Sequence, residues 1–270
     1  MTLTSASWAP VSTAASSAVE PSRAGSPGGV CAIHQPNLFP RLSTLAKLYA
    51  ADRWIVLDDV QFVRRDYQHR ARLAALDDPA AQQWLTLPAH LPRGRPTLIS
   101  EALLADPGRS RRTVGHLVRQ YYGRSCHWLD VREALEAVLD EFEATDRVSD
   151  VARASTVALL DALGWSGEVL DSSAIPTRGG RSERLADLAA ATSSTHYLCG
   201  TGGRRYLDSR AFDARDIQVL FFHTPVNTSE PLWQWARRTS SLWAVSSLGS
   251  TALGGKLIEC RPAAVLAASA

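Results

Sequence analysis

Apolar runs and polar loops alternate in a regular order near the start of the chain. The apolar run 30–33 is followed by a loop that contains Pro36 and Pro40, and two prolines exclude a strand ladder or a helix interior there. Apolar residues then recur at helical spacing over 42–49, and a second apolar run follows at 54–57. Strand, helix and strand within about thirty residues predict a βαβ unit with parallel strands and a right-handed crossover.

The same periodicities predict further elements downstream. Helical spacing predicts three helices within a middle section at 109–164, which Gly164 terminates. A later helix has Ser182 as its expected N-cap, and the segment 225–255 shows poor periodicity. Short apolar runs predict strands at 83–87, 168–170, 195–199 and 217–222.

The chain is therefore expected to be an α/β protein, with a Rossmann-like, mostly parallel sheet, flanking helices and a helical middle section. Residues 1–29 are mostly Ala, Ser, Gly and Pro, and we expect a flexible leader because they bury too little apolar surface to offset their ordering entropy. Residues 30–260 are expected to form a single α/β domain of about 230 residues, and residues 261–270 a tail.

Composition and charge narrow the classes of function. The net charge of +2 argues against a protein that grips nucleic acid, and no apolar run reaches the length of about 18 residues that spans a membrane. Four cysteines lie far apart without a C-x-x-C pair, which favours reduced thiols over a zinc ribbon or a disulfide scaffold. No secretory signal is recognised at the start of the chain. We expect a cytoplasmic protein with no metal site, no nucleic-acid partner and no membrane partner.

The basic residues are divided unevenly between arginine and lysine. Of the 29 basic residues 27 are Arg, and the two lysines are Lys47 and Lys256. A GC-rich genome that encodes Arg at surface positions explains this bias. Because arginine already provides the surface charge, each remaining lysine is a candidate for a specific role. Lys47 flanks the apolar stripe of the helix at 42–49. It is either an ordinary surface lysine or a side chain that reaches back toward the loop after the first strand.

Polar residues follow several predicted strands at the point where each strand ends. The carboxyl ends of parallel strands meet at one edge of a sheet, where ligands bind in open α/β folds. His34 suits the role of acid, base or phosphate donor because its pKa lies near neutrality, and the alternative is a structural histidine bonded to a loop carbonyl. The strand-end residues are His34 and Gln35, Asp58 and Asp59, residues 200–203, and His223.

Two further segments carry candidate chemistry. Asp58 and Asp59 suit Mg²⁺ or the orientation of a base, although adjacent residues of an extended chain point to opposite faces, so at most one faces a shared site. The alternative for this pair is a solvated turn or an N-cap. The segment 61–72 alternates cationic, amide and aromatic groups, whose arginine forks suit a carboxylate or a phosphate, and the alternative is a solvated basic strand.

The glycine-rich residues 200–203 resemble a backbone nest for an anion, and Arg204 and Arg205 follow directly. Glycines also make ordinary turns, and the spacing matches neither a Walker loop nor a dinucleotide fingerprint. Cys199 is either a nucleophile or a buried small apolar residue. The serines within 239–247 lack a G-x-S-x-G elbow, which disfavours a serine-hydrolase triad.

Together these motifs resemble the WbqC-like family, whose members occur in O-antigen, polysaccharide and specialised-metabolite gene clusters. The resemblance covers about residues 30–225, with His69 where such proteins tend to carry Asn, and the segment 226–255 departs from the family's C-terminal pattern. The matching residues are 33–40, Lys47, 51–52, 57–62, Arg65, Gln68, Arg70, 84–88, Ile99, 197–200, 206–208 and Phe212.

The resemblance implies a biosynthetic enzyme of natural-product or glycan assembly, which forms a C–N bond by acyl or aminoacyl transfer. Its implied partners are a small-molecule substrate and an acyl or peptidyl carrier protein. A weaker, fold-level similarity to HIGH-type nucleotidyltransferases such as pantothenate synthetase rests on the histidine loop after the first strand. It implies ATP with Mg²⁺ as the candidate cofactor, although the H-x-G-H motif is absent.

These resemblances assign roles to individual residues. His34 is expected to be a general base or a charge stabiliser, Lys47 to stabilise an anion, and Asp58 or Asp59 to orient the histidine or the amine. The residues expected to bind substrate are Gln35, Asn37, Gln61, Arg65, Gln68, Arg70, Gly200 and Tyr206.

Two alternatives stay open. In the first, Lys47 forms an imine with a carbonyl substrate, as in lyase or cyclodehydration chemistry. In the second, the chain is a non-catalytic protein that recognises a carrier protein or a nucleotide sugar through the Arg-rich surface at 109–124.

Overall fold

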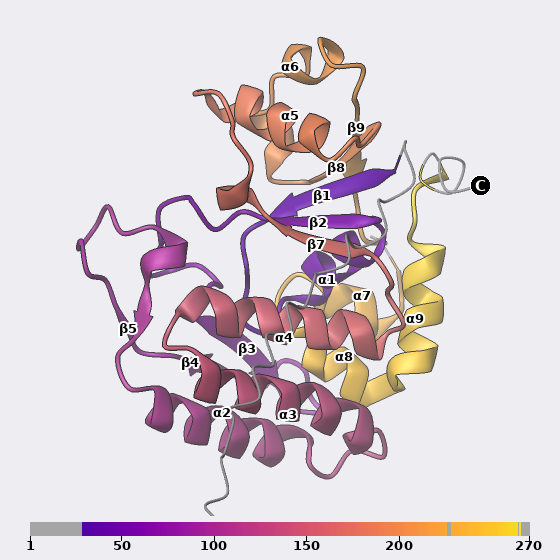
Figure 1. Ribbon diagram of the computed structural model, residues 1–270. Helices are drawn as coiled ribbons and strands as arrows, with labels where there is room; N and C mark the ends of the chain where they lie inside the picture. Colours follow the sequence, from indigo (N-terminus) through magenta and orange to yellow (C-terminus); the bar gives the residue numbers. More distant parts are fainter. Residues whose placement is uncertain (1–28, 226–227, 264, 266–270) are drawn as a thin grey trace, which may run out of the picture.

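A computed structural model describes residues 29–225, 228–263 and 265, with a five-stranded sheet at its centre (Figure 1). All strand pairs of this sheet are parallel, and the order is β7-β2-β1-β8-β9. The predicted α/β class with a Rossmann-like sheet is therefore confirmed. The strands are β1 (Val30–His34), β2 (Arg53–Val56), β7 (Glu168–Asp171), β8 (His196–Gly200) and β9 (Gln218–Phe222).

The order of the strands positions the candidate site. The strand β1 lies at the centre of the sheet, with β2 and then β7 on one side of it. The later strands β8 and β9 lie on the other side of β1. The direction of strand order reverses between β1 and β8, so the segments after these strands diverge and leave a crevice beyond their carboxyl ends. The parallel direction on which the expected site depends is thus present.

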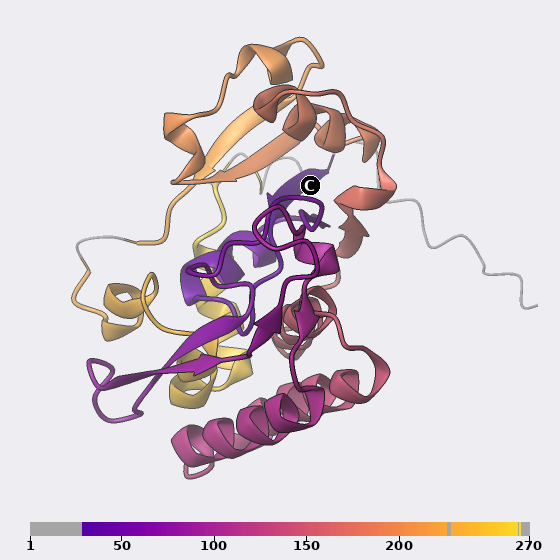
Figure 2. The same ribbon diagram turned by 90° about the vertical axis from the view of Figure 1, so that its left-hand side faces the viewer.

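The two faces of the sheet are covered by different parts of the chain. Cys31 and Ile33 pack into a cluster with α5 and α6, whereas Ala32, between them, joins the larger cluster that includes α1. This alternation is the two-residue period of a strand buried on both faces. Figures 1 and 2 show α5 and α6 on one side of the sheet and the other helices on the opposite side. The covering helices are α1 (Leu42–Tyr49), α5 (Arg181–Ala191) and α6 (Arg210–Asp213).

The predicted helical middle section is confirmed. Its three helices are α2 (Pro107–Tyr122), α3 (Trp128–Ala144) and α4 (Val148–Ala162), with α3 packed against both others. Asp106 caps α2 by accepting a hydrogen bond from Arg109 N at 2.8 Å. Gly164 has a φ of 77°, which is the left-handed conformation expected of the residue that stops a helix.

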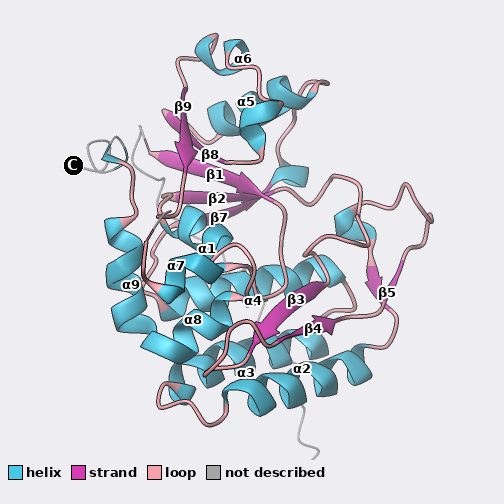
Figure 3. Ribbon diagram, turned by 180° about the vertical axis from the view of Figure 1, so that it is seen from behind, coloured by secondary structure: helices cyan, strands magenta, loops and turns pink. Residues whose placement is uncertain are grey.

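A small antiparallel part of the chain stands apart from the central sheet (Figure 3). The strand predicted at 83–87 lies there and not in the parallel sheet. It is one arm of a hairpin formed by β3 (Arg70–Ala74) and β4 (Gln82–Thr86), and a second pair is formed by β5 (Ala89–His90) and β6 (Leu103–Leu104).

Two expectations need correction. Ser182 does not cap α5, because Gly180 is the residue before the helix and the Ser182 hydroxyl accepts a hydrogen bond from Asp208 N at 2.9 Å. The segment without clear periodicity contains three helices, and α8 is buried at Ser241–Ser246, so it has no polar face to set a period. These helices are α7 (Pro231–Trp235), α8 (Ser241–Leu248) and α9 (Ser250–Glu259).

Within the described ranges, no helix combines the length and the apolarity needed to cross a membrane. The leader expected at 1–29 lies outside these ranges except for Gly29, and most of the tail expected at 261–270 does too. Both stay predictions.

Candidate functional site

Two cavities flank the carboxyl end of β1. The small cavity has a volume of about 340 Å³ and is lined by the ends of β1 and β8, by α1 and by the turn after α7. The large cavity has a volume of about 860 Å³ and is lined by the ends of β1 and β2 and by the start of α5. Ile33, His34 and Tyr197 line both cavities, so the end of β1 separates two halves of one site.

Lys47 lies inside the small cavity. It belongs to the last turn of α1, where every neighbouring position is also buried, and only 5% of the residue is exposed. Its Nζ donates a hydrogen bond to Ile33 O at 3.2 Å, at the end of β1. Burial lowers the pKa of Lys47 to about 8, against the opposing effect of the nearby Cys199 and Cys31. Lys47 therefore reaches the strand edge, and its ammonium loses its proton just above neutral pH.

His34 is the last residue of β1 and faces the same space. Its Nε2 atom is buried and has no hydrogen-bond partner among the described residues. Burial lowers the pKa of His34 well below its usual value, and the charges of Lys47 and Arg41 add to this effect, whereas a hydrogen bond with Asn37 opposes it. The imidazole is therefore neutral at pH 7, and Nε2 is free to interact with a ligand.

The loop after β1 is anchored to the helical middle section. Ser155 and Thr156 of α4 donate hydrogen bonds to Asn37 O at 3.3 and 3.0 Å, and Ser155 also accepts one from Phe39 N at 2.8 Å. Asn37 is buried behind His34 and lines neither cavity. Its contribution is to hold the His34 loop and not to contact a ligand directly.

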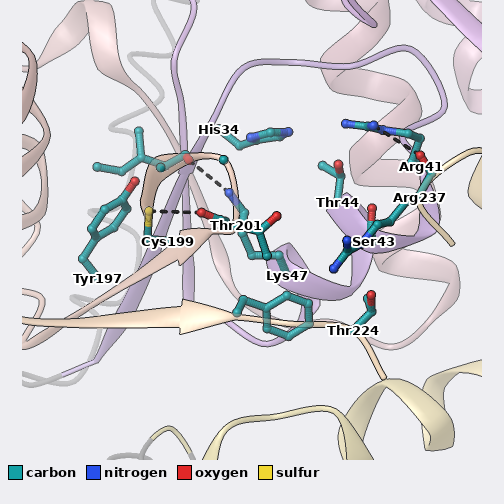
Figure 4. A pocket seen from close by; sticks show the side chains of 15 residues that line it. His34, Arg41, Ser43, Thr44, Lys47, Tyr197, Cys199, Thr201, Thr224 and Arg237 are labelled. Atoms are coloured by element: carbon teal, nitrogen blue, oxygen red, sulfur yellow. Dashed lines mark hydrogen bonds between the residues drawn. The ribbon is translucent and has the colours of Figure 1, made fainter. Parts of the chain in front are cut away.

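Two arginines complete the wall of the small cavity. Arg41, just before α1, donates a hydrogen bond to Arg237 O at 3.3 Å, and its guanidinium lies 4.2 Å from the centroid of the Tyr67 ring. In Figure 4 the imidazole of His34 and the guanidinium of Arg41 point toward one another across the cavity. With Lys47, three cationic side chains line this cavity without any carboxylate among its described lining residues, so it suits an anionic group.

The glycine-rich turn after β8 closes the small cavity, and Gly200 is among its lining residues. A Cβ atom at Gly203 would lie 2.3 Å from the Cys199 sulfur, so only glycine allows this close approach. Cys199 is buried and donates a weak hydrogen bond to Gly200 O at 3.4 Å. Burial raises its pKa, which favours the buried apolar role over that of a nucleophile.

Besides His34, the large cavity receives three of the residues expected from the sequence, namely Gln35, Asp59 and Gln61. Asp59 accepts a hydrogen bond from the Ser172 hydroxyl and forms an ion pair with Arg184 of α5. The Gln61 side chain donates to Arg95 O at 2.7 Å.

Two expected residues lie just behind the large cavity. Gln68 is fully buried and donates to Oε1 of Gln35 at 2.9 Å, so it positions a lining residue. Asp58 accepts hydrogen bonds from Ser172 and Ser173 and lines neither cavity. Burial, followed by the nearby carboxylates of Asp171 and Asp59, raises the pKa of Asp58. As the sequence predicted, only one member of the aspartate pair faces the site.

Besides Asn37 and Gln68, three further expected substrate-binding residues line neither cavity. Arg65 is exposed, and Arg70 binds backbone carbonyls of its own loop and stacks at 4.3 Å on the ring of Trp84. Tyr206 is 63% exposed, with the guanidinium of Arg181 located 5.1 Å from its ring centroid. Arg70 therefore stabilises the β3–β4 hairpin and its loop. Tyr206 lies beside Arg181, which is itself a lining residue of the large cavity.

Sequence reasoning missed five arginines that line the cavities. The residues Thr177–Arg181 read Thr-Arg-Gly-Gly-Arg, and a glycine pair between arginines is a signal of an anion-binding loop that was available in the sequence. No comparable sequence signal marks the other three arginines, which lie outside this segment. The five arginines are Arg41, Arg178, Arg181, Arg184 and Arg237.

No group of three or more His, Cys, Asp and Glu side chains in the described part of the chain is arranged to hold a metal ion. The candidate cofactor, ATP with Mg²⁺, stays a prediction.

Known proteins similar to this chain share its central region. The uncharacterized protein Rv1507c of Mycobacterium tuberculosis (strain ATCC 25618 / H37Rv) is 27% identical over 191 residues, which cover 71% of this chain and 80% of that protein. No solved structure matches. The WbqC-like protein family matches residues 35–233, which include the His34 loop from Gln35 onward and most of the lining of both cavities. The chain therefore belongs to the WbqC-like protein family.

Proposed function

We propose that this protein is a biosynthetic enzyme that transfers an acyl or aminoacyl group to the amine of a small-molecule or carrier-bound acceptor, in natural-product or glycan assembly. The small cavity supports this proposal most directly. It combines a neutral His34, whose Nε2 has no partner in the described structure, with the buried cation of Lys47 at the same strand edge. Acyl transfer to an amine needs both a proton acceptor and a stabiliser of negative charge.

Each group has one task in the proposed step. The amine nitrogen attacks the acyl carbonyl carbon and forms the C–N bond, and Nε2 of His34 takes the proton that the nitrogen loses. The Lys47 ammonium and the Arg41 guanidinium stabilise the negative charge that develops on the carbonyl oxygen. The bond from the acyl carbon to the leaving group then breaks, and the leaving group departs with the electron pair.

The charge of the small cavity also favours a reactive amine. An ammonium group is disfavoured beside Arg41, Lys47 and Arg237, so the acceptor amine binds in its neutral, nucleophilic form. The same cations favour an acceptor that carries a carboxylate or a phosphate.

The step also predicts a pH dependence. Lys47 must stay protonated to stabilise the developing anion, and its pKa is about 8. Turnover should therefore fall as the pH rises through about 8, where the ammonium is lost.

The test is direct formation of an amide. Acyl phosphates and N-acetylcysteamine thioesters are incubated with a panel of amino acids and amino sugars, with and without ATP and Mg²⁺, and products are identified by mass spectrometry. Wild-type protein is expected to form an amide, and His34→Ala to lose it while its circular dichroism spectrum stays unchanged. His116→Ala, at an exposed position of α2, is the control that removes an imidazole far from both cavities. Equal turnover by His34→Ala and wild type would contradict the proposed role of His34.

A second candidate is imine formation by Lys47, which its lowered pKa favours because the neutral amine is the nucleophile. Here Nζ condenses with a substrate carbonyl and water leaves. Borohydride trapping of an aldehyde or keto acid on Lys47, located by peptide mass, would select this chemistry over acyl transfer. If His34→Ala and Lys47→Met both leave ligand binding intact and no product forms with any donor, a non-catalytic binding protein becomes the better description.

A further inference from the structure

The large cavity has a composition that the acyl-transfer step does not use. Three arginines, Arg178, Arg181 and Arg184, line it, and Asp59 is its one carboxylate among the described lining residues. The other lining residues include the apolar side chains of Leu57, Val60 and Leu185. A cavity lined by both cationic and apolar side chains suits a ligand that has an anionic part and an apolar part.

The positive charge of this cavity is only partly compensated within the protein. Arg184 is paired with Asp59, and Arg178 is paired with Asp187, which also binds Arg215 at 2.6 Å. Asp187 is thus shared by two cations.

Arg181 contacts no carboxylate in the described structure and lies over the ring of Tyr206 instead. Because its side chain is exposed, its guanidinium is available to a ligand that enters the cavity. An anion placed among the three arginines would supply the charge that the protein itself does not.

The dimensions favour a ligand larger than a simple carboxylic acid. A volume of about 860 Å³ lies within the range of sites for nucleotide-sized molecules, whereas the small cavity has about 340 Å³. Arginine forks bind phosphate oxygens in pairs, and three arginines in one cavity match a diphosphate better than one carboxylate.

We infer that the large cavity binds a nucleotide-sized phosphate ester, with its phosphates at Arg178, Arg181 and Arg184 and its ring against Leu57 and Val60. This inference deepens the proposed function and rests on it for one point, that the activated acyl donor is such an ester with the acyl group joined to a phosphate oxygen as a mixed anhydride. The small cavity then holds the amine acceptor, and His34, which lines both cavities, stands between donor and acceptor. The leaving phosphate stays in the arginine cluster when its bond to the acyl carbon breaks.

The test is a binding measurement that needs no turnover. The full chain is titrated with ADP, pyrophosphate and adenosine by isothermal titration calorimetry. We expect saturable binding of ADP and pyrophosphate, and Arg181→Ala, at an exposed position that should not disturb folding, should weaken both at least tenfold. Adenosine, which has no phosphate, should bind to wild type and Arg181→Ala equally.

Two control variants make the test specific. Arg112→Ala removes an equal charge from α2 and should leave ADP affinity unchanged, and Lys47→Met should change it less than twofold because Lys47 lines the other cavity. The inference is overturned if neither ADP nor pyrophosphate binds saturably, if Arg112→Ala weakens binding as much as Arg181→Ala, or if Lys47→Met has the larger effect. If no amide forms but ADP and pyrophosphate bind as expected, the proposed function is overturned and the inferred phosphate site stands.

Discussion

Each of the two cavities at the end of β1 contains three cationic side chains, but the protein treats these cations differently. In the small cavity, no carboxylate lies among the described lining residues, and Lys47 is buried with a backbone carbonyl as its partner. In the large cavity, Arg184 and Arg178 are paired with Asp59 and Asp187. Burial without a counter-ion shifts a pKa and makes a group reactive, whereas pairing keeps a cation in its ordinary state for binding.

The largest expected effect separates the two cavities by kinetics. Once an amide-forming substrate pair is found, His34→Ala should lower kcat by about 10²-fold or more, because a proton acceptor is lost from the reacting atoms. Arg181→Ala should instead raise KM for the donor, because it acts in binding. Steady-state kinetics with each substrate varied in turn will show whether the division holds. If both variants change only kcat, or both change only KM, the two cavities do not have separate roles in catalysis and binding.

The next effect concerns stability and has opposite signs in the two cavities. The pKa of Lys47 falls from 10.5 to about 8 on folding, which corresponds to about 3 kcal/mol. Between these two pH values the unfolded chain binds more protons, so wild-type stability rises with pH across this window. At pH 7, where the cost of burying the ammonium is complete, Lys47→Met should therefore stabilise the fold.

Urea unfolding followed by circular dichroism measures this change. The advantage of Lys47→Met should shrink as the pH rises from 8 toward 10.5, because wild-type Lys47 is then neutral in both states. In contrast, Arg184→Met should destabilise the protein, since it leaves the half-buried Asp59 without its cation. A destabilised Lys47→Met at pH 7 would mean that the buried ammonium has an unrecognised counter-charge.

The two lysines allow the pKa of Lys47 to be measured directly. In protein labelled with ¹³C and ¹⁵N lysine, two Cε–Nζ signals are expected, and the Lys47 signal should titrate near pH 8. Lys256 is the internal control, because a hydrogen bond to Glu230 at 2.9 Å raises its pKa above the usual value. Two signals with the same midpoint would remove the distinction between a reactive and an ordinary lysine.

The smallest effect tests whether the cavities are insulated from a remote change. Asp106→Ala removes the N-cap hydrogen bond of α2 and should cost about 1 kcal/mol in urea unfolding. It should leave ADP affinity and the Lys47 titration unchanged, because α2 contributes no residue to either cavity. A change in the ADP affinity or in the Lys47 pKa would show that these two properties depend on the overall stability of the fold and not on local charge.

Much of the fold was predictable because its elements have strong local signals. The strands β1 and β2 are short apolar runs, and α2, α3 and α4 each have one buried and one exposed face. Where a helix is buried over most of its length, as α8 is at Ser241–Ser246, the period disappears and the sequence predicts no helix. The hairpin strand β4 was recognised as a strand but not as part of a separate pair, because apolar content does not specify a partner.

The site was predictable where it depends on the ends of strands. His34 and Gly200 are the last residues of β1 and β8, and Asp59 follows β2, so the three lie at one edge of the sheet. Lys47 was singled out by its rarity, and the structure places it in the small cavity. Arg65 and Arg70 have the right chemistry, but Arg65 is exposed and Arg70 is directed into the hairpin region, since a charge pattern alone does not fix the direction of a side chain.

The joining of the β1 loop to the C-terminal helices has a consequence for biosynthesis on the ribosome. Ser43 N donates to Ala236 O, and Ser241 N donates to Pro40 O, at 2.9 and 2.8 Å. The parallel sheet can pair once β9 has left the exit tunnel, but the cavity wall at Arg237 and these hydrogen bonds form only after Ser241 has followed it. The small cavity is thus completed after the sheet, so a chain that ends before Arg237 lacks part of the wall around Lys47.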